Sequence, residues 1–185
     1  MKKIFCLETE WGFSPKKMRH KASMQPMLSF LEQSANVEYV FRNVAAREDL
    51  KYYLKQLNYK TYKDYQIIYL AFHGLSQSIL IPSEPEPISF SDLADISKEV
   101  FQDRFIHFGS CRTLNTSDGI IQEFKTKTGA KLVSGYTRSV DFIRSSIMDI
   151  AYFWELVNAK NLGSINNRIE KRYGTLKEEL GFKIL

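Results

Sequence analysis

Short continuous apolar runs alternate with stretches of helical periodicity along this chain. Five runs predict strands, and a sixth is expected at the end: KIFCLE at 3–8, VEYVFRNV at 37–44, YQIIYLAF at 65–72, RFIHFG at 104–109, KLVSGY at 131–136 and GFKIL at 181–185. The third run is apolar on both faces. That pattern is typical of a strand at the centre of a parallel sheet covered by helices.

Between these runs, apolar residues recur three and four positions apart, which predicts helices with one buried face. Such helices are expected around Met24–Leu31, Leu50–Leu57, Leu93–Val100 (opened by Ser91 and Asp92), Ile120–Phe124 and 164–173. The longest predicted stripe faces the core with Ile143, Ile147, Ile150, Ala151, Trp154 and Val157. Prolines at 82, 85 and 87 exclude a central strand and predict a hairpin or loop.

The alternation of strands and helices predicts the fold class. We expect an α/β protein: a three-layer α/β/α sandwich around a mostly parallel sheet of about six strands. With 185 residues, of which 44% are hydrophobic and 25% charged, the chain fits one globular domain spanning residues 1–185. The apolar stretch IFCL near the N-terminus is too short for a signal peptide, and no run approaches the roughly 20 apolar residues of a membrane span. We therefore expect a cytoplasmic protein without membrane contact.

The net charge of +5 includes one basic cluster, PKKMRHK at residues 15–21, which suits phosphate or an acidic partner. No aromatic or glycine-rich nucleic-acid signature accompanies it, so a solvated loop is the simpler interpretation and nucleic acid is not an expected partner. The three histidines and two cysteines lack the spacings of zinc sites. We expect no metal and no other cofactor.

Candidate chemistry lies where two apolar runs end. YLAFHG places His73, and IHFGSC places Cys111, at the carboxyl ends of interior strands. If these strands are neighbours, their backbones lie about 4.8 Å apart, and the imidazole can take the proton of the thiol, whose ordinary pKa of about 8.5 leaves little thiolate at neutral pH. Gly74 leaves its amide open to a substrate carbonyl, and with the amide of Cys111 it could form an oxyanion hole.

These residues resemble the caspase-like cysteine peptidases, the clan of caspases, gingipains and separase, and most closely its CHAT type. The order of motifs is similar over residues 62–165: a strand ending in His-Gly, a strand ending before Cys, then TGAKLVSGYTRSVDF and SIMDIAYFWELVNAKNLGS. The tryptophan usual before Val-Asp in that family is replaced by the segment YTRS. The resemblance implies a peptidase of peptide or protein substrates in which Cys111 is the nucleophile, His73 the general base, Gly74 the glycine beside the oxyanion hole and Asp141 an acidic residue near the substrate cleft.

Three carboxylates suggest a preference for arginine or lysine side chains. Glu8 and Glu10 end the first strand on the same edge as the dyad, and with Asp141 they could make an acidic pocket. The alternatives are surface carboxylates for the first two and a helix cap for Asp141. His107 lies inside its strand and is interpreted as a core histidine with its hydrogen bonds satisfied.

Two other functions stay open. A catalytically inactive caspase-like module for protein interaction would have a blocked cleft or a Cys111 that points into the core. A flavodoxin-like or nucleotide-binding domain is less favoured, because the chain has neither a G-x-G-x-x-G motif nor a P-loop. The sequence does not fix the oligomeric state.

Overall fold

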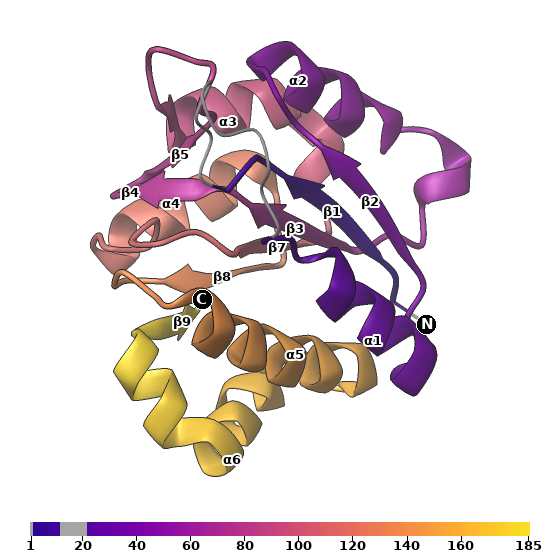
Figure 1. Ribbon diagram of the computed structural model, residues 1–185, viewed down its shortest axis with the longest axis vertical. Coiled ribbons are helices and arrows are strands. Elements are labelled where there is room, and N and C mark those ends of the chain that lie inside the picture. The colour runs from indigo at the N-terminus through magenta and orange to yellow at the C-terminus, as the bar shows by residue number, and fades with distance from the viewer. Residues whose placement is uncertain (1, 12–21) are drawn as a thin grey trace.

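The computed structural model describes residues 2–11 and 22–185, so the basic segment at 15–21 lies outside the described residues. Six strands form the central sheet in the order β2-β1-β3-β7-β8-β9 (Figure 1). They are β1 (Ile4–Glu8), β2 (Tyr39–Asn43), β3 (Ile67–Ala71), β7 (Phe105–Phe108), β8 (Leu132–Tyr136) and β9 (Phe182–Ile184). Five of them are parallel, and β9 pairs antiparallel with β8. The predicted mostly parallel α/β sheet is confirmed.

Helices cover both faces of this sheet, which makes three layers (Figure 1). One layer holds α2 (Arg47–Gln56), α3 (Phe90–Ser97) and α4 (Asp118–Thr128), and the other holds α1 (Gln25–Ala35), α5 (Phe142–Asn158) and α6 (Ile165–Leu180). Short 3₁₀ turns lie at Lys60–Tyr62 (η1), Lys98–Phe101 (η2) and Leu162–Ser164 (η3). None of the helices within residues 2–11 and 22–185 has the length and apolar character of a membrane span.

The period of two along each strand divides the core between the layers. In β7, Ile106 and Phe108 pack toward α2, α3 and α4, whereas Phe105 packs toward α1, α5 and α6. His107 shares the second face, and its side chain is fully buried there. Apolar residues on both faces explain why the interior strands appear as continuous runs in the sequence.

The proline-containing segment forms a small antiparallel sheet of β4 (His73–Leu75), β5 (Ser78–Leu80) and β6 (Ile88–Ser89), as the prolines predict. The helix that follows begins at Phe90, one residue before the predicted Ser91. Ser89 caps it: its hydroxyl accepts from the Asp92 amide at 3.1 Å, and the Asp92 carboxylate accepts from the Ser89 amide at 3.1 Å. The hairpin therefore leads directly into α3.

The predicted buried stripe of α5 is wrong for three of its six residues, whereas Ala151 is buried as predicted and Ile150 and Val157 are partly buried. Ile143, Ile147 and Trp154 are 64%, 50% and 43% exposed, and the buried face instead includes Asp149, Tyr152 and Phe153. The apolar residues of α5 lie on most sides of the helix, so their spacing alone does not determine which face is buried. The polar partners of Asp149 in the core determine the buried face, because a buried carboxylate needs hydrogen-bond donors.

Candidate functional site

The candidate site lies at the carboxyl edge of the sheet, where the strand order reverses. β1 pairs with β2 on one side and with β3 on the other, so the segments after β1 and β3 leave this edge in different directions. Ligands of open α/β sheets bind at such a switch point. Trp11 follows β1, His73 follows β3, and Cys111 follows β7, the next neighbour of β3. The two strands that deliver His73 and Cys111 are therefore neighbours, the condition on which the proposed pairing depends.

The hairpin that begins at His73 packs directly on the turn that carries Cys111. A Cβ atom added to Gly74 would lie 2.5 Å from the Cys111 carbonyl oxygen and 2.3 Å from the Thr113 hydroxyl. The Gln77 amide donates to the Thr113 carbonyl at 3.0 Å, which fastens the hairpin to the same turn. Gly74 is thus required by a close approach of two backbones, a reason that its position in the sequence does not reveal.

Cys111 lies against the N-terminus of α5. The Val140 amide donates to Sγ at 3.3 Å, and Sγ lies 3.7 Å from the Val140 carbonyl oxygen. Cys111 is partly exposed, whereas Cys6 is fully buried and burial raises the pKa of its thiol well above the usual range. The two cysteines therefore have different chemical environments.

His73 contacts an aromatic residue that sequence reasoning missed. The indole ring of Trp11 meets the imidazole edge-on, with ring centroids 5.0 Å apart, and meets the ring of Phe142 at 5.8 Å. Trp11 and Phe142 are both partly exposed. The indole therefore joins His73 to the start of α5, beside the residue that contacts Cys111.

The three predicted carboxylates have separate surroundings. Glu8 is 2% exposed and accepts hydrogen bonds from the Trp11 indole at 2.7 Å, the Ser23 hydroxyl at 2.6 Å and the Met24 amide at 2.6 Å. Asp141 caps α5, because its Oδ1 accepts from the amides of Ile143 and Arg144 at 3.0 Å. Glu10 is exposed. Glu8 thus has little surface to offer a substrate, and the helix-cap interpretation of Asp141 is confirmed.

A buried polar network lies beneath the site. His107 contacts Ser134 through Nδ1 and Asp149 through Nε2, both at 2.9 Å, and Tyr69 donates to Asp149 at 2.7 Å. Tyr136 donates to the same carboxylate. Burial, together with the negative charge of Asp149, raises the pKa of Tyr69 and of Tyr136 well above the usual range. His107 is therefore a core histidine with both ring nitrogens satisfied, as predicted.

The network also supports the position of the candidate nucleophile. The Tyr136 carbonyl accepts from the Leu114 amide at 3.0 Å, three residues after Cys111, and the Tyr136 hydroxyl lies 3.0 Å from the Ser145 carbonyl in the first turn of α5. One residue at the end of β8 therefore ties the Cys111 turn to the helix start. Hydrophobic periodicity does not reveal this role of Tyr136, because it depends on the backbone carbonyl and the side-chain hydroxyl of a single strand residue.

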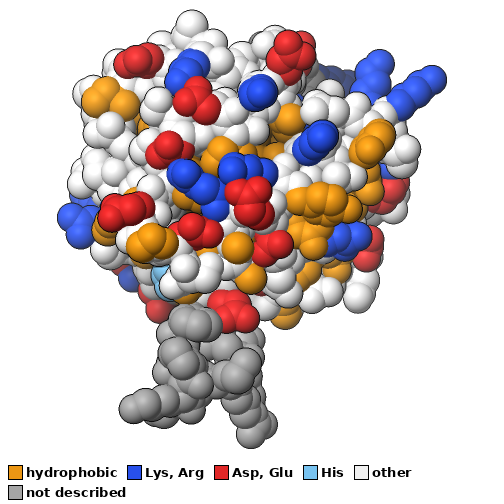
Figure 2. Space-filling model, turned by 90° about the horizontal axis from the view of Figure 1, so that it is seen from above, with side chains coloured by type: hydrophobic (Ala, Val, Ile, Leu, Met, Phe, Trp, Pro, Cys, Tyr) orange, Lys and Arg blue, Asp and Glu red, His pale blue; other side chains and the backbone are white. Residues whose placement is uncertain are grey.

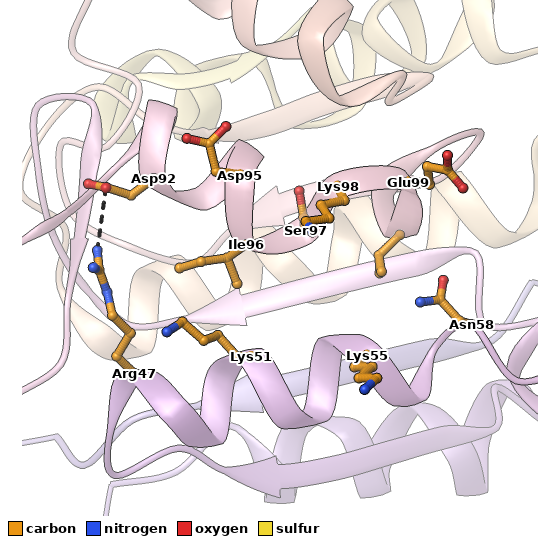
Figure 3. A pocket seen from close by; sticks show the side chains of 11 residues that line it. Arg47, Lys51, Lys55, Asn58, Asp92, Asp95, Ile96, Ser97, Lys98 and Glu99 are labelled. Atoms are coloured by element: carbon orange, nitrogen blue, oxygen red, sulfur yellow. Dashed lines mark ion pairs between the residues drawn. The ribbon is translucent and has the colours of Figure 1, made fainter.

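A groove of about 720 Å³ lies between α2 and α3, apart from these residues (Figure 3). Arg47, Lys51 and Lys55 line one wall, and acidic residues of α3 and η2 line the other; Arg47 and Asp92 approach to 3.6 Å. Figure 2 shows side chains of both charges mixed over this side of the molecule. In the part of the chain that the structure describes, no three His, Cys, Asp or Glu side chains cluster closely enough to hold a metal ion.

Comparison with known protein families places the chain in one of them. A family model described as a family of unknown function (DUF6642) matches residues 1–185. A search of the curated proteins gave no match. The geometry of the site is therefore the basis for a functional assignment.

Proposed function

This chain belongs to the DUF6642 family, and we propose that it is a caspase-like cysteine peptidase with Cys111 as nucleophile and His73 as general base. The observation that carries the proposal is the packing of Gly74 against the Cys111 carbonyl at the switch point of the sheet. That contact holds the segment that begins at His73 against the turn that carries Cys111. Nucleophilic catalysis needs a partly exposed thiol within reach of an imidazole, and this packing brings the segments that carry them together.

The residues divide the reaction between them. His73 takes the proton of the Cys111 thiol, and the thiolate attacks the scissile carbonyl carbon. The amides of Gly74 and Cys111 donate to the oxyanion of the tetrahedral intermediate. His73 then gives its proton to the leaving amine as the C–N bond breaks. Water, deprotonated by the same imidazole, hydrolyses the thioester and restores the thiol.

The contacts of Cys111 favour this function over an inactive interaction module. Its sulfur accepts a hydrogen bond from the Val140 amide, just before α5, and the residue is partly exposed. The cytoplasm suits this chemistry, because a reducing compartment keeps both free cysteines as thiols. The proposed substrates are peptides or proteins.

The test is the rate at which iodoacetamide alkylates Cys111 between pH 5 and 9, followed by mass spectrometry of the intact protein. Cys111→Ser provides the background from Cys6, whose burial predicts very slow labelling. We expect His73→Ala to slow alkylation of Cys111 near neutral pH about tenfold or more, since the thiolate loses its proton acceptor. Leu75→Ala changes an exposed neighbour on the same hairpin and should leave the rate unchanged.

An alkylation profile that His73→Ala does not alter would contradict the dyad. Cys111 would then be an isolated thiol, and the interaction module would become the better assignment. A His73-dependent profile would justify a screen of peptide substrates.

A further inference from the structure

We infer that the side chain that the substrate places at the scissile bond is apolar and packs against Trp11 and Phe142. The inference rests on the proposed function and adds a substrate class to it. It departs from the arginine or lysine preference that the carboxylates of the sequence suggest.

Trp11 contacts both the proposed base and the start of α5. Its ring is in edge-on contact with His73, the proposed base, and with Phe142 on α5. The hydrogen bond from the indole to buried Glu8 fixes the orientation of the ring. A partly exposed aromatic ring held in one orientation presents a rigid apolar surface at little entropic cost to a ligand.

The contacts of Trp11 lead on toward the proposed nucleophile, Cys111. Phe142 is two residues after Val140, whose amide donates to the Cys111 sulfur at 3.3 Å and whose carbonyl oxygen lies 3.7 Å from it. Trp11, Val140 and Phe142 are partly buried and all pack on the core under α1, α5 and α6. The chain of contacts from the imidazole of His73 to the segment that contacts the Cys111 sulfur therefore passes through the rings of Trp11 and Phe142.

Three charged residues near these rings, Glu8, Asp141 and Arg144, make contacts within the fold. Both oxygens of Glu8 are occupied in the interior, and Asp141 caps α5. Arg144 pairs with Glu179. A charged substrate side chain against Trp11 and Phe142 would lose water without gaining a buried partner of opposite charge, whereas an apolar one gains from desolvation.

The experiment measures labelling of Cys111 by acyloxymethyl ketones that carry one residue, Phe, Leu, Lys or Asp, next to the ketone. We expect the Phe and Leu probes to react about tenfold or more faster than the Lys and Asp probes, the discrimination that a hydrophobic pocket supplies. Trp11→Ala should reduce this ratio about tenfold. Trp154→Ala removes a partly exposed tryptophan of α5 outside the site and should leave the ratio unchanged.

Two further variants keep the test informative if Trp11→Ala is unstable in urea. Phe142→Ala removes the other ring from a different element, and Trp11→Phe keeps an aromatic ring but loses the bond to Glu8. Faster labelling by the Lys or Asp probe, or a ratio unchanged by loss of either ring, would overturn the apolar subsite and leave the dyad intact. Iodoacetamide labelling that does not depend on His73 would overturn the proposed function, and the inference with it.

Discussion

Replacing Tyr136 by phenylalanine removes one hydroxyl from the buried network and leaves the ring in place. That hydroxyl donates to the Asp149 carboxylate, which keeps Tyr69 and His107 as partners. A buried hydrogen bond to a charged group contributes about 1.5–3 kcal/mol, so we expect the free energy of unfolding at pH 7 to fall by about 2 kcal/mol. Tyr152→Phe is the matched control: its buried hydroxyl accepts from the neutral Ser134 hydroxyl at 2.9 Å, and its loss should cost about 1 kcal/mol.

The same tyrosines make the protein sensitive to alkali. Burial raises the pKa of Tyr69, Tyr136 and Tyr152 above the value of about 10 that they have in the unfolded chain. The folded protein therefore binds more protons than the unfolded chain above pH 10, and the free energy of unfolding falls as the pH rises. Each tyrosine contributes about 1.4 kcal/mol per pH unit, and the three together about 4 kcal/mol per pH unit.

Urea unfolding followed by circular dichroism between pH 7 and 11.5 measures both effects. Above pH 10, the decline in stability of Tyr136→Phe should be shallower than that of wild type by about 1.4 kcal/mol per pH unit, because one titrating group is gone. Tyr52 is 60% exposed, so Tyr52→Phe should leave the decline unchanged. Equal losses for Tyr136→Phe and Tyr152→Phe at pH 7, or an unaltered alkaline decline in Tyr136→Phe, would refute the assignment of Tyr136 to a charged buried partner.

Four other substitutions and one control test the local geometry by urea denaturation. Gly74→Ala should lower the free energy of unfolding by about 1–3 kcal/mol through overpacking against the turn that carries Cys111, and abolish His73-dependent alkylation. In the control Gly119→Ala, the added methyl of α4 would lie at an ordinary contact distance of 3.8 Å from the Ser117 hydroxyl, and stability should rise by about 0.5 kcal/mol. Ser89→Ala removes the cap of α3 and should cost about 1 kcal/mol. The hydrogen bonds from Ser89 lower the pKa of Asp92, so the stabilisation by Asp92 is present above about pH 4 and is lost in acid. Asp92→Asn should therefore lower the free energy of unfolding at about pH 7 but not near pH 2. A loss of stability that persists near pH 2 would contradict this. Lys98 has a φ of 42°, so Lys98→Gly should raise stability by about 1 kcal/mol, and a loss would show that its side chain is needed.

The central sheet could be predicted because its interior strands are apolar on both faces, which leaves an unmistakable run such as residues 65–72. The same property hides the pairing order, since nothing in an apolar run specifies its neighbour. His73 and Cys111 could be chosen because each interrupts such a run at its carboxyl end. The adjacency of the strands that deliver them depends on the strand order of the sheet, which the structure provides.

The buried face of α5 and the role of Glu8 could not be predicted, for a shared reason. Both depend on donors that are distant in the sequence: Asp149 on Tyr69, 80 residues earlier, and Glu8 on the Ser23 hydroxyl and the Met24 amide. Hydrophobic periodicity reports how a segment meets water, and it carries no information about such polar partners. Trp11 and Phe142 lie at the boundaries of elements, where no period applies.

The order in which the strands are synthesised has a consequence for the assembly of the proposed dyad. In the central sheet, β7, β8 and β9 each join beside the central-sheet strand made before them, so the sheet can grow at one edge during translation. Cys111 is synthesised before Val140, so its sulfur gains the contact with the Val140 amide only when the segment at the start of α5 has been made. Until then the thiol lacks this neighbour, which would delay the proposed peptidase activity in a nascent chain.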